Sequence, residues 1–326
     1  MATLTIPSNA DGTIFDPSLN SVIASAIAAV PFGFDDVYVY SHGWSTDAER
    51  SSVDYDVFSV GLMRRLLVEQ QQSGPLPTPP KSALEMGIHW PSEITEDPDS
   101  PLSDAQLFTF FTMKQRADAV GKNLVYSVLR LALTARQNQP LRFFVIGHSF
   151  GCKVVCAALN DIQADLGPTI PISPLTSWKV VLLEAATDQD NLEPNDIYGN
   201  IGKLSNLRIL LTTSQLDLAL TQWYPRASAI ANFFHGASPT PALGAAGPSP
   251  ATVAYFGGMA NLRVDVGFAM STAVGATGQL VVADLTPVHK ARTQGARPTY
   301  SGGISGSHSD IFFDEIYNLV GGFFYS

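Results

Sequence analysis

Residues 141–159, LRFFVIGHSFGCKVVCAAL, decide the fold of this chain. The run before Gly147 is apolar apart from Arg142, as in a buried strand of a parallel sheet. After Gly151, apolar residues recur at helical spacing, which predicts a helix packed on that sheet. Residues 147–151 spell G-x-S-x-G, the pattern of a sharp strand-to-helix turn that holds a serine hydroxyl clear of its neighbours. We therefore expect Ser149 to be a nucleophile that attacks a carbonyl carbon.

Segments of strand character alternate with helical segments along the rest of the chain. The predicted strands are residues 36–41, 83–89, 141–146, 178–183, 207–211 and 279–285, and the predicted helices are residues 51–72, 102–136 and 311–320. This alternation predicts an α/β fold with a mostly parallel central sheet flanked by helices. The length of 326 residues fits a single domain, residues 1–326.

Residues 219–276 interrupt this alternation. They are rich in proline, alanine and glycine and contain several aromatic residues. We interpret them as a cap-like or lid-like insertion within the domain. In a parallel α/β sheet such an insertion is expected over the carboxyl ends of the strands, where it would shape a substrate pocket.

Composition excludes several classes of partner. The net charge of −10, without a run of Lys or Arg, argues against binding of nucleic acid. No apolar stretch is long enough to span a bilayer, and the first residues have no signal-peptide pattern, so a cytoplasmic location is expected. Cys152 and Cys156 lie four residues apart on one predicted helix and are expected to be free, buried thiols rather than a disulfide or metal ligands.

A nucleophilic serine needs a base, usually histidine. Of the six histidines, His308 fits best, because its glycine-rich segment lies between the last predicted strand and the closing helix. His289 follows the same strand and stays as the alternative base. His148 adjoins Ser149 but is expected to point in the opposite sense.

The base in turn needs a carboxylate to orient it. Asp217 follows the strand at residues 207–211, and the order Ser149, Asp217, His308 is the order expected of a nucleophile elbow with its partners. Asp188 and Asp284 also follow predicted strands and remain alternatives.

The oxyanion of acyl transfer needs backbone N–H donors. One is expected from Phe150, directly after the nucleophile, and the other from Trp44 in the turn that ends the strand at residues 36–41. Gly43 in that turn would let a substrate approach the backbone.

These motifs together resemble the α/β-hydrolase superfamily, and within it the lipases and carboxylesterases. The resemblance covers His42-Gly43-Trp44, the G-x-S-x-G pentapeptide, Asp217 and His308. It implies an eight-stranded, mostly parallel sheet and hydrolysis through an acyl-enzyme on a Ser-His-Asp triad, with no cofactor and no metal. A serine nucleophile argues against epoxide and halide substrates, for which members of this superfamily use aspartate.

The expected function is hydrolysis of small, apolar, short-to-medium-chain carboxylic esters. The residues expected to contact the substrate are His42, His148, Trp223, Tyr224 and Phe233, although the aromatic residues of the insertion could equally form its own small core. The alternatives are another acyl hydrolase or transferase on the same triad (thioesterase, amidase, peptidase or acyltransferase) and a non-catalytic binding protein of the same fold. No sequence feature specifies an oligomeric state.

Overall fold

The fold is that of a computed structural model. It describes residues 2–13, 21, 23–25, 35–44, 46–77, 81–92, 104–136, 139–166, 170, 172–235, 240–293 and 306–326. Within these ranges, the side chains of residues 104–109 and 230–235 are not described.

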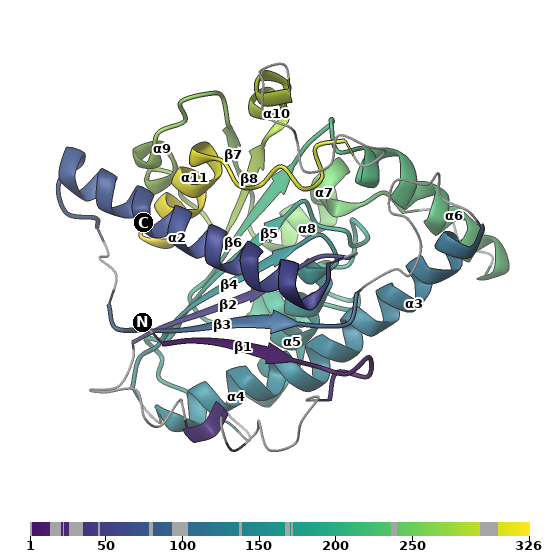
Figure 1. The fold of residues 1–326 in the computed structure, drawn as a ribbon, viewed down its shortest axis with the longest axis horizontal. Helices are drawn as coiled ribbons and strands as arrows, with labels where there is room; N and C mark the ends of the chain where they lie inside the picture. The colour runs from purple at the N-terminus through teal and green to yellow at the C-terminus, as the bar shows by residue number, and fades with distance from the viewer. Residues whose placement is uncertain are drawn as a thin grey trace.

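A single sheet of eight strands forms the centre of the molecule (Figure 1). The strands are β1 (Ala2–Pro7), β2 (Asp36–Ser41), β3 (Ala83–His89), β4 (Arg142–His148), β5 (Ser177–Leu183), β6 (Leu207–Thr213), β7 (Ala260–Arg263) and β8 (Leu280–Asp284). Their order across the sheet is β1-β3-β2-β4-β5-β6-β8-β7, and every pairing between them is parallel. The α/β fold predicted from the sequence is therefore confirmed, with a sheet that is entirely parallel rather than mostly so.

Helices cover both faces of the sheet. The α-helices are α2 (Ala48–Ser73), α3 (Asp104–Val120), α4 (Tyr126–Ala135), α5 (Gly151–Asp165), α6 (Tyr224–His235), α7 (Leu243–Ala246), α8 (Pro250–Tyr255), α9 (Met270–Val274), α10 (Thr286–Thr293) and α11 (Asp314–Phe324). Two π-helical turns, η1 (Gly121–Val125) and η3 (Ala219–Trp223), and one 3₁₀ turn, η2 (Gly199–Lys203), adjoin them. None of the described helices is long and apolar enough to cross a membrane.

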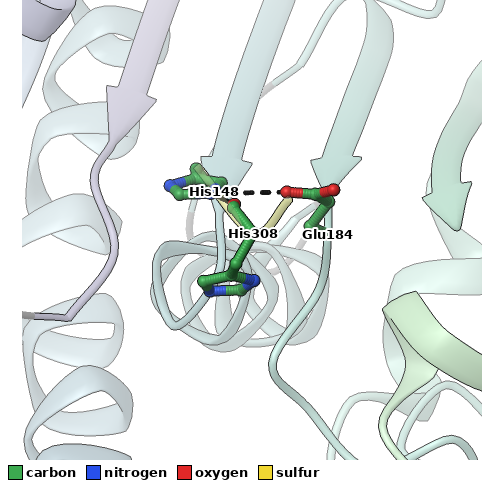
Figure 2. A group of neighbouring side chains, drawn as sticks. All are labelled: His148, Glu184 and His308. Carbon is green, nitrogen blue, oxygen red and sulfur yellow. Dashed lines mark hydrogen bonds and ion pairs between the residues drawn. The ribbon is translucent and has the colours of Figure 1, made fainter. Parts of the chain in front are cut away.

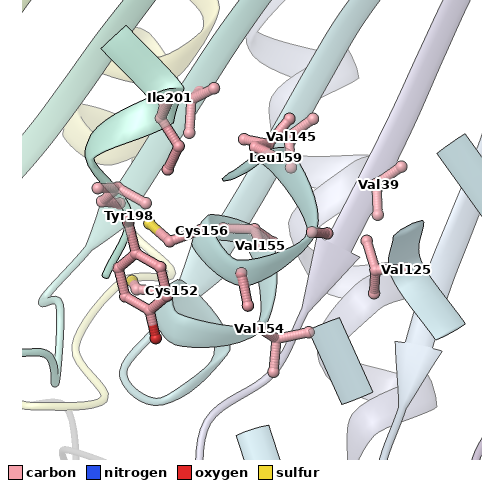
Figure 3. Close-up of a cluster of buried hydrophobic side chains, with 14 of the residues drawn as sticks. Val39, Val125, Val145, Cys152, Val154, Val155, Cys156, Leu159, Tyr198 and Ile201 are labelled. Carbon is pink, nitrogen blue, oxygen red and sulfur yellow. The ribbon is translucent and has the colours of Figure 1, made fainter. Parts of the chain in front are cut away.

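Alternation along the strands divides the core into two layers. Val37 and Val39 of β2 point to the face covered by α3, α4 and α5, whereas Tyr40 points to the face covered by α2, α9 and α11. Figure 3 shows part of the first layer, in which α5 packs against β2 and β4. Leu159 of α5 is fully buried there, and such burial contributes about 1.5–3 kcal/mol.

Two strands were not predicted from the sequence. β1 extends the sheet beyond β3, and β7 forms its opposite edge beside β8. Because β7 and α9 lie within residues 219–276, part of the range interpreted as an insertion belongs to the sheet and to the helical layer around α11. The remaining elements of that range are η3, α6, α7 and α8. Cys152 and Cys156 are buried and free, as expected.

Strand order determines where the sheet can hold a ligand. After β2, the chain adds β3 on one side of that strand and then β4 on the other. The direction of strand addition thus reverses between β2 and β4, and a parallel sheet opens a crevice at the carboxyl ends of such a pair. The carboxyl end of β2 leads into His42 and Gly43, and that of β4 leads into Ser149.

Lys179 of β5 supplies a test of the packing between the sheet and α11. Its Nζ lies 3.4 Å from the carbonyl oxygen of Phe323. Burial, with the nearby guanidinium groups of Arg208 and Arg142, lowers its pKa to about 7. The unfolded chain binds this proton more tightly, so the protonated group reduces stability fully below pH 7 and progressively less as pH rises toward about 10.4.

We therefore expect Lys179→Met to raise the melting temperature at pH 6 and to lose that advantage by pH 10. Thermal unfolding followed by circular dichroism across this range measures the effect. A melting-temperature difference between variant and wild type that does not change with pH would contradict a depressed lysine pKa.

Candidate active site

The turn between β4 and α5 holds Ser149 in a left-handed backbone conformation, with φ of 55°. Residues other than glycine rarely adopt this conformation, and it persists only where the surroundings enforce it. Here the Ser149 N–H donates to the carbonyl of Leu183, and the Ser149 carbonyl accepts from the N–H groups of Ala186 and Cys152. The end of β5 therefore fixes the strained residue at the end of β4.

Glycine is required at three positions around this serine. A Cβ on Gly151 would lie 2.1 Å from the Ser41 carbonyl oxygen, and one on Gly147 would lie 2.6 Å from the Cys152 nitrogen. A Cβ on Gly43 would lie 2.7 Å from the Cβ of Ser149. Such distances are well inside van der Waals contact, so a side chain at any of these positions would force the contacting segments apart. Steric exclusion of a Cβ therefore explains why both glycines of the G-x-S-x-G pattern are needed.

Three residues distant in sequence form a hydrogen-bonded line. Oγ of Ser149 lies 2.7 Å from Nε2 of His308, and Nδ1 of His308 lies 2.7 Å from Oδ2 of Asp217. Asp217 is fully buried, and Ser149 is 4% exposed. In the tautomer that satisfies both contacts, the serine hydroxyl donates to Nε2, and Nδ1–H donates to the carboxylate. The structure brings together the three residues predicted from the sequence.

Backbone contacts hold the acid and the base to each other. The Leu220 N–H donates to Oδ1 of Asp217 at 2.9 Å, which leaves Oδ2 for His308. Asp217 forms an isolated β-bridge with Gly306, and the Ser307 N–H donates to the carbonyl of Leu216. The segment that carries His308 is thereby attached to the turn that carries Asp217.

The other two candidate acids have different partners. Asp188 accepts from Nζ of Lys114 at 2.5 Å and from the hydroxyl of Tyr224 at 2.8 Å. Asp284 accepts from the backbone N–H of Thr286 at the start of α10. Asp217 is thus the one of the three that contacts His308.

His289, the alternative base, is fully buried. Its Nδ1 lies 2.9 Å from Oγ of Ser214, and its Nε2 lies 3.1 Å from the carbonyl oxygen of Asp310. Burial lowers its pKa to about 4, so it is neutral near pH 7. These contacts place it behind the triad and not against Ser149.

Two backbone N–H groups adjoin the nucleophile, those of Trp44 and Phe150. Within the ranges that the structure describes, neither donates a hydrogen bond to another residue. Phe150 is the N-cap of α5, so the positive end of that helix lies beside Ser149. Gly43 lies against Ser149, so the turn that carries Trp44 is next to this serine. The surroundings of Ser149 therefore suit a developing negative charge.

His42, which was predicted to contact the substrate, is buried. Its Nε2 accepts from the Trp90 N–H at 3.2 Å, and its Nδ1 lies 2.7 Å from the Gly43 carbonyl. The ring stacks on Trp90 with centroids 5.4 Å apart. Burial lowers its pKa to about 3, so the neutral ring supports the turn that carries Trp44.

His148 contacts the segment of the base. Its Nε2 lies 2.8 Å from the His308 carbonyl oxygen, a contact in which the imidazole N–H donates. The two rings lie with centroids 5.2 Å apart. Burial lowers the His148 pKa to about 3, so this ring is neutral near pH 7.

Glu184 is a residue of this site that sequence reasoning missed. It directly follows β5, has φ of 46°, and lies fully buried near His148 (Figure 2). Burial, with the charges of Asp217 and Asp310, raises its pKa well above the usual range. Its position after an apolar strand, like those of Ser149 and Asp217, is the signal that could have revealed it.

The aromatic residues expected to contact substrate have mixed positions. Tyr224 is buried, and its ring lies 5.2 Å from that of Phe110, which in turn lies 5.2 Å from that of Phe150. The Trp223 ring lies beneath the guanidinium of Arg226 at 4.9 Å. The side chain of Phe233 lies outside the described residues.

A scan against protein-family models, a search of curated proteins and a search of solved structures each found no match to this chain.

The Gly151 contact predicts a large effect of a single methyl group. We expect Gly151→Ala to destabilise the protein by about 3 kcal/mol or more, because its Cβ would meet the Ser41 carbonyl. Gly275→Ala is the matched control, since its Cβ would have 3.6 Å to its nearest neighbours. Urea unfolding of both variants gives the comparison, and equal midpoints would show that β2 and α5 are not in this contact.

Proposed function

We propose that this chain is a serine hydrolase that cleaves carboxylic esters. The observation that carries the proposal is the hydrogen-bonded line Ser149–His308–Asp217, with the serine in a left-handed turn between a strand and a helix. A serine hydroxyl attached to an oriented imidazole is the arrangement that nucleophilic acyl transfer requires.

In the proposed acylation step, Nε2 of His308 takes the proton of Ser149 as Oγ attacks the ester carbonyl. The carboxylate of Asp217 keeps the proton on Nδ1 and stabilises the imidazolium that forms. The N–H groups of Trp44 and Phe150 hold the oxyanion of the tetrahedral intermediate, and the N-terminus of α5 adds a favourable field.

The intermediate then collapses. His308 returns its proton to the alcohol oxygen, which leaves, and the acyl group stays on Ser149. His308 next takes a proton from water, which attacks the acyl-enzyme, and finally protonates Oγ as the carboxylic acid departs. The ester and one water molecule supply every atom of the acid and alcohol products, and Ser149 and His308 return to their starting protonation states.

We further propose the α/β-hydrolase fold for the domain, with the helical part of residues 219–276 as its cap. Supporting this are the parallel sheet, the nucleophile at the carboxyl end of β4 and the strand reversal between β2 and β4. The acyl group we infer is apolar and of short to medium length, because rings of Trp44, Phe110 and Phe150 pack together next to the nucleophile.

Another acyl transfer on the same triad, such as thioester or amide hydrolysis, is the alternative. All of these reactions share the nucleophile and differ in the leaving group. A non-catalytic binding protein is less consistent with a triad that has both of its hydrogen bonds. A panel of p-nitrophenyl esters, thioesters and anilides separates these functions.

The proposed role of Ser149 predicts how its substitution changes activity. We expect the wild type to hydrolyse p-nitrophenyl esters and to be labelled by a fluorophosphonate probe. Ser149→Ala removes the nucleophile, so kcat is expected to fall by about 10⁶-fold and labelling to disappear. A variant that keeps full esterase activity would overturn the mechanism.

The proposed role of Asp217 predicts a loss of activity when its charge is removed. Asp217→Asn is expected to lower kcat by about 10⁴-fold, because the imidazole loses the partner that sets its tautomer. Asp188→Asn is the matched control, because Asp188 contacts Lys114 and Tyr224 instead of His308. Steady-state kinetics of both variants decide the assignment, and a larger loss in Asp188→Asn would transfer the acid role to that residue.

A further inference from the structure

A second set of side chains meets beside the triad. His148 comes from the end of β4, Glu184 from the end of β5 and His308 from the segment before α11 (Figure 2). One ring nitrogen of each histidine and one carboxyl oxygen of Glu184 lie within 4.8 Å of one another. Among the residues that the structure describes, this is the one group of three such side chains close enough to share an ion.

The carboxyl group of Glu184 has no partner that explains its burial. The residue is fully buried, and neither oxygen has a hydrogen bond within the described part of the chain. Its nearest imidazoles are His148, with Nε2 at 3.9 Å, and His289, with Nδ1 at 3.7 Å. Because an unsatisfied buried carboxyl group reduces stability, its retention needs a reason.

We propose that His148, Glu184 and His308 bind a divalent transition-metal ion of the Zn²⁺ type, and that the bound ion switches the nucleophile off. Two imidazoles and one carboxylate form a ligand set that suits Zn²⁺. The fourth position is left for water. The inhibitory consequence rests on the proposed function, whereas the binding of the ion does not.

The three ligand atoms lie within 4.8 Å of one another, so the site would close by up to about 1.4 Å around a tetrahedral ion. Zn²⁺ bonds nitrogen and oxygen ligands at about 2.0–2.2 Å, which puts tetrahedral ligand atoms about 3.4 Å apart. Nε2 of His148 and Oε2 of Glu184, 3.9 Å apart, would approach by about 0.5 Å. In doing so, His148 would exchange its hydrogen bond to the His308 carbonyl for the metal, with its proton held on Nδ1.

Occupation of the site disables His308 as a base. Both of its ring nitrogens already have partners in the triad, Ser149 and Asp217. A metal on either nitrogen therefore breaks one of these contacts. If the metal takes the nitrogen that faces Ser149, Asp217 keeps its hydrogen bond and orients the ring, as carboxylates commonly do for metal-bound histidines.

The test begins with binding measured apart from activity. Isothermal titration of Zn²⁺ into the full-length chain carrying Ser149→Ala, which retains all three ligands, is expected to give one tight site. Adding Glu184→Gln or His148→Gln is expected to weaken that site by at least about tenfold. Glu69→Gln, on α2 and away from the cluster, is the matched control and is expected to leave binding unchanged.

The visible absorption spectrum of Co²⁺ bound to the wild type tests the metal site without any variant, and so does not depend on a variant that folds. Co²⁺ in place of Zn²⁺ is expected to give the intense visible absorption of a tetrahedral site, lost on addition of Zn²⁺. Absence of this band together with absence of a tight Zn²⁺ site would overturn the proposal. Equal Zn²⁺ affinity in correctly folded Glu184→Gln would also overturn it, because the metal would then lie elsewhere.

A second experiment tests whether the bound ion inhibits the proposed activity. Zn²⁺ is expected to inhibit ester hydrolysis and fluorophosphonate labelling in the same concentration range as it binds, and a chelator is expected to restore both. Tight binding without inhibition would refute the inhibitory role of the ion, whereas the metal site itself would stand. A chain that binds Zn²⁺ but neither hydrolyses esters nor reacts with the probe would refute the hydrolase function instead.

Discussion

The close approach of three backbone segments at the carboxyl ends of β2, β4 and β5 is the constraint on which the site depends. Gly151 lies so near the Ser41 carbonyl that only hydrogen fits between them, and Ser149 exchanges backbone hydrogen bonds with the end of β5. These contacts hold the serine in a conformation it would otherwise avoid. The backbone of Ser149 is thus held from both sides, and its hydroxyl lies 2.7 Å from Nε2 of His308.

Of the four histidines around the site, His308 contacts both Ser149 and Asp217, and the other three are neutral near pH 7. Burial lowers the pKa of His42 and His148 to about 3 and that of His289 to about 4. None of the three therefore adds positive charge near neutral pH, and each holds a backbone or hydroxyl group in place. In the proposed acyl transfer, the positive charge on His308 would face Asp217 without competition from another imidazolium.

Local pattern was sufficient for the elbow and the larger strands, and insufficient for the edges of the sheet. The run before Gly147 is continuously apolar and the apolar residues after Gly151 recur at helical spacing, so β4 and α5 could be predicted directly. β1 and β7 carry weak signals, since an edge strand has one neighbour and β7 is only four residues long. The order of Ser149, Asp217 and His308 could be predicted, because the ends of parallel strands meet. Glu184 also follows a buried strand, but a lone carboxylate there is usually a turn residue, so its full burial became apparent only in the structure.

The spacing of the triad along the chain has a consequence for how the protein folds. Ser149 and Asp217 are separated by 217 − 149 = 68 residues, and Asp217 and His308 by 308 − 217 = 91 residues. Contacts of such long range form slowly, since large loops must close before any hydrogen bond repays the lost chain entropy. His308 lies six residues before α11, all of whose residues except Asp314 are buried, so we expect His308 to reach Ser149 when this helix docks. Reactivity of one serine hydroxyl would therefore report completion of the whole fold during refolding, including the arrival of its most distant segment.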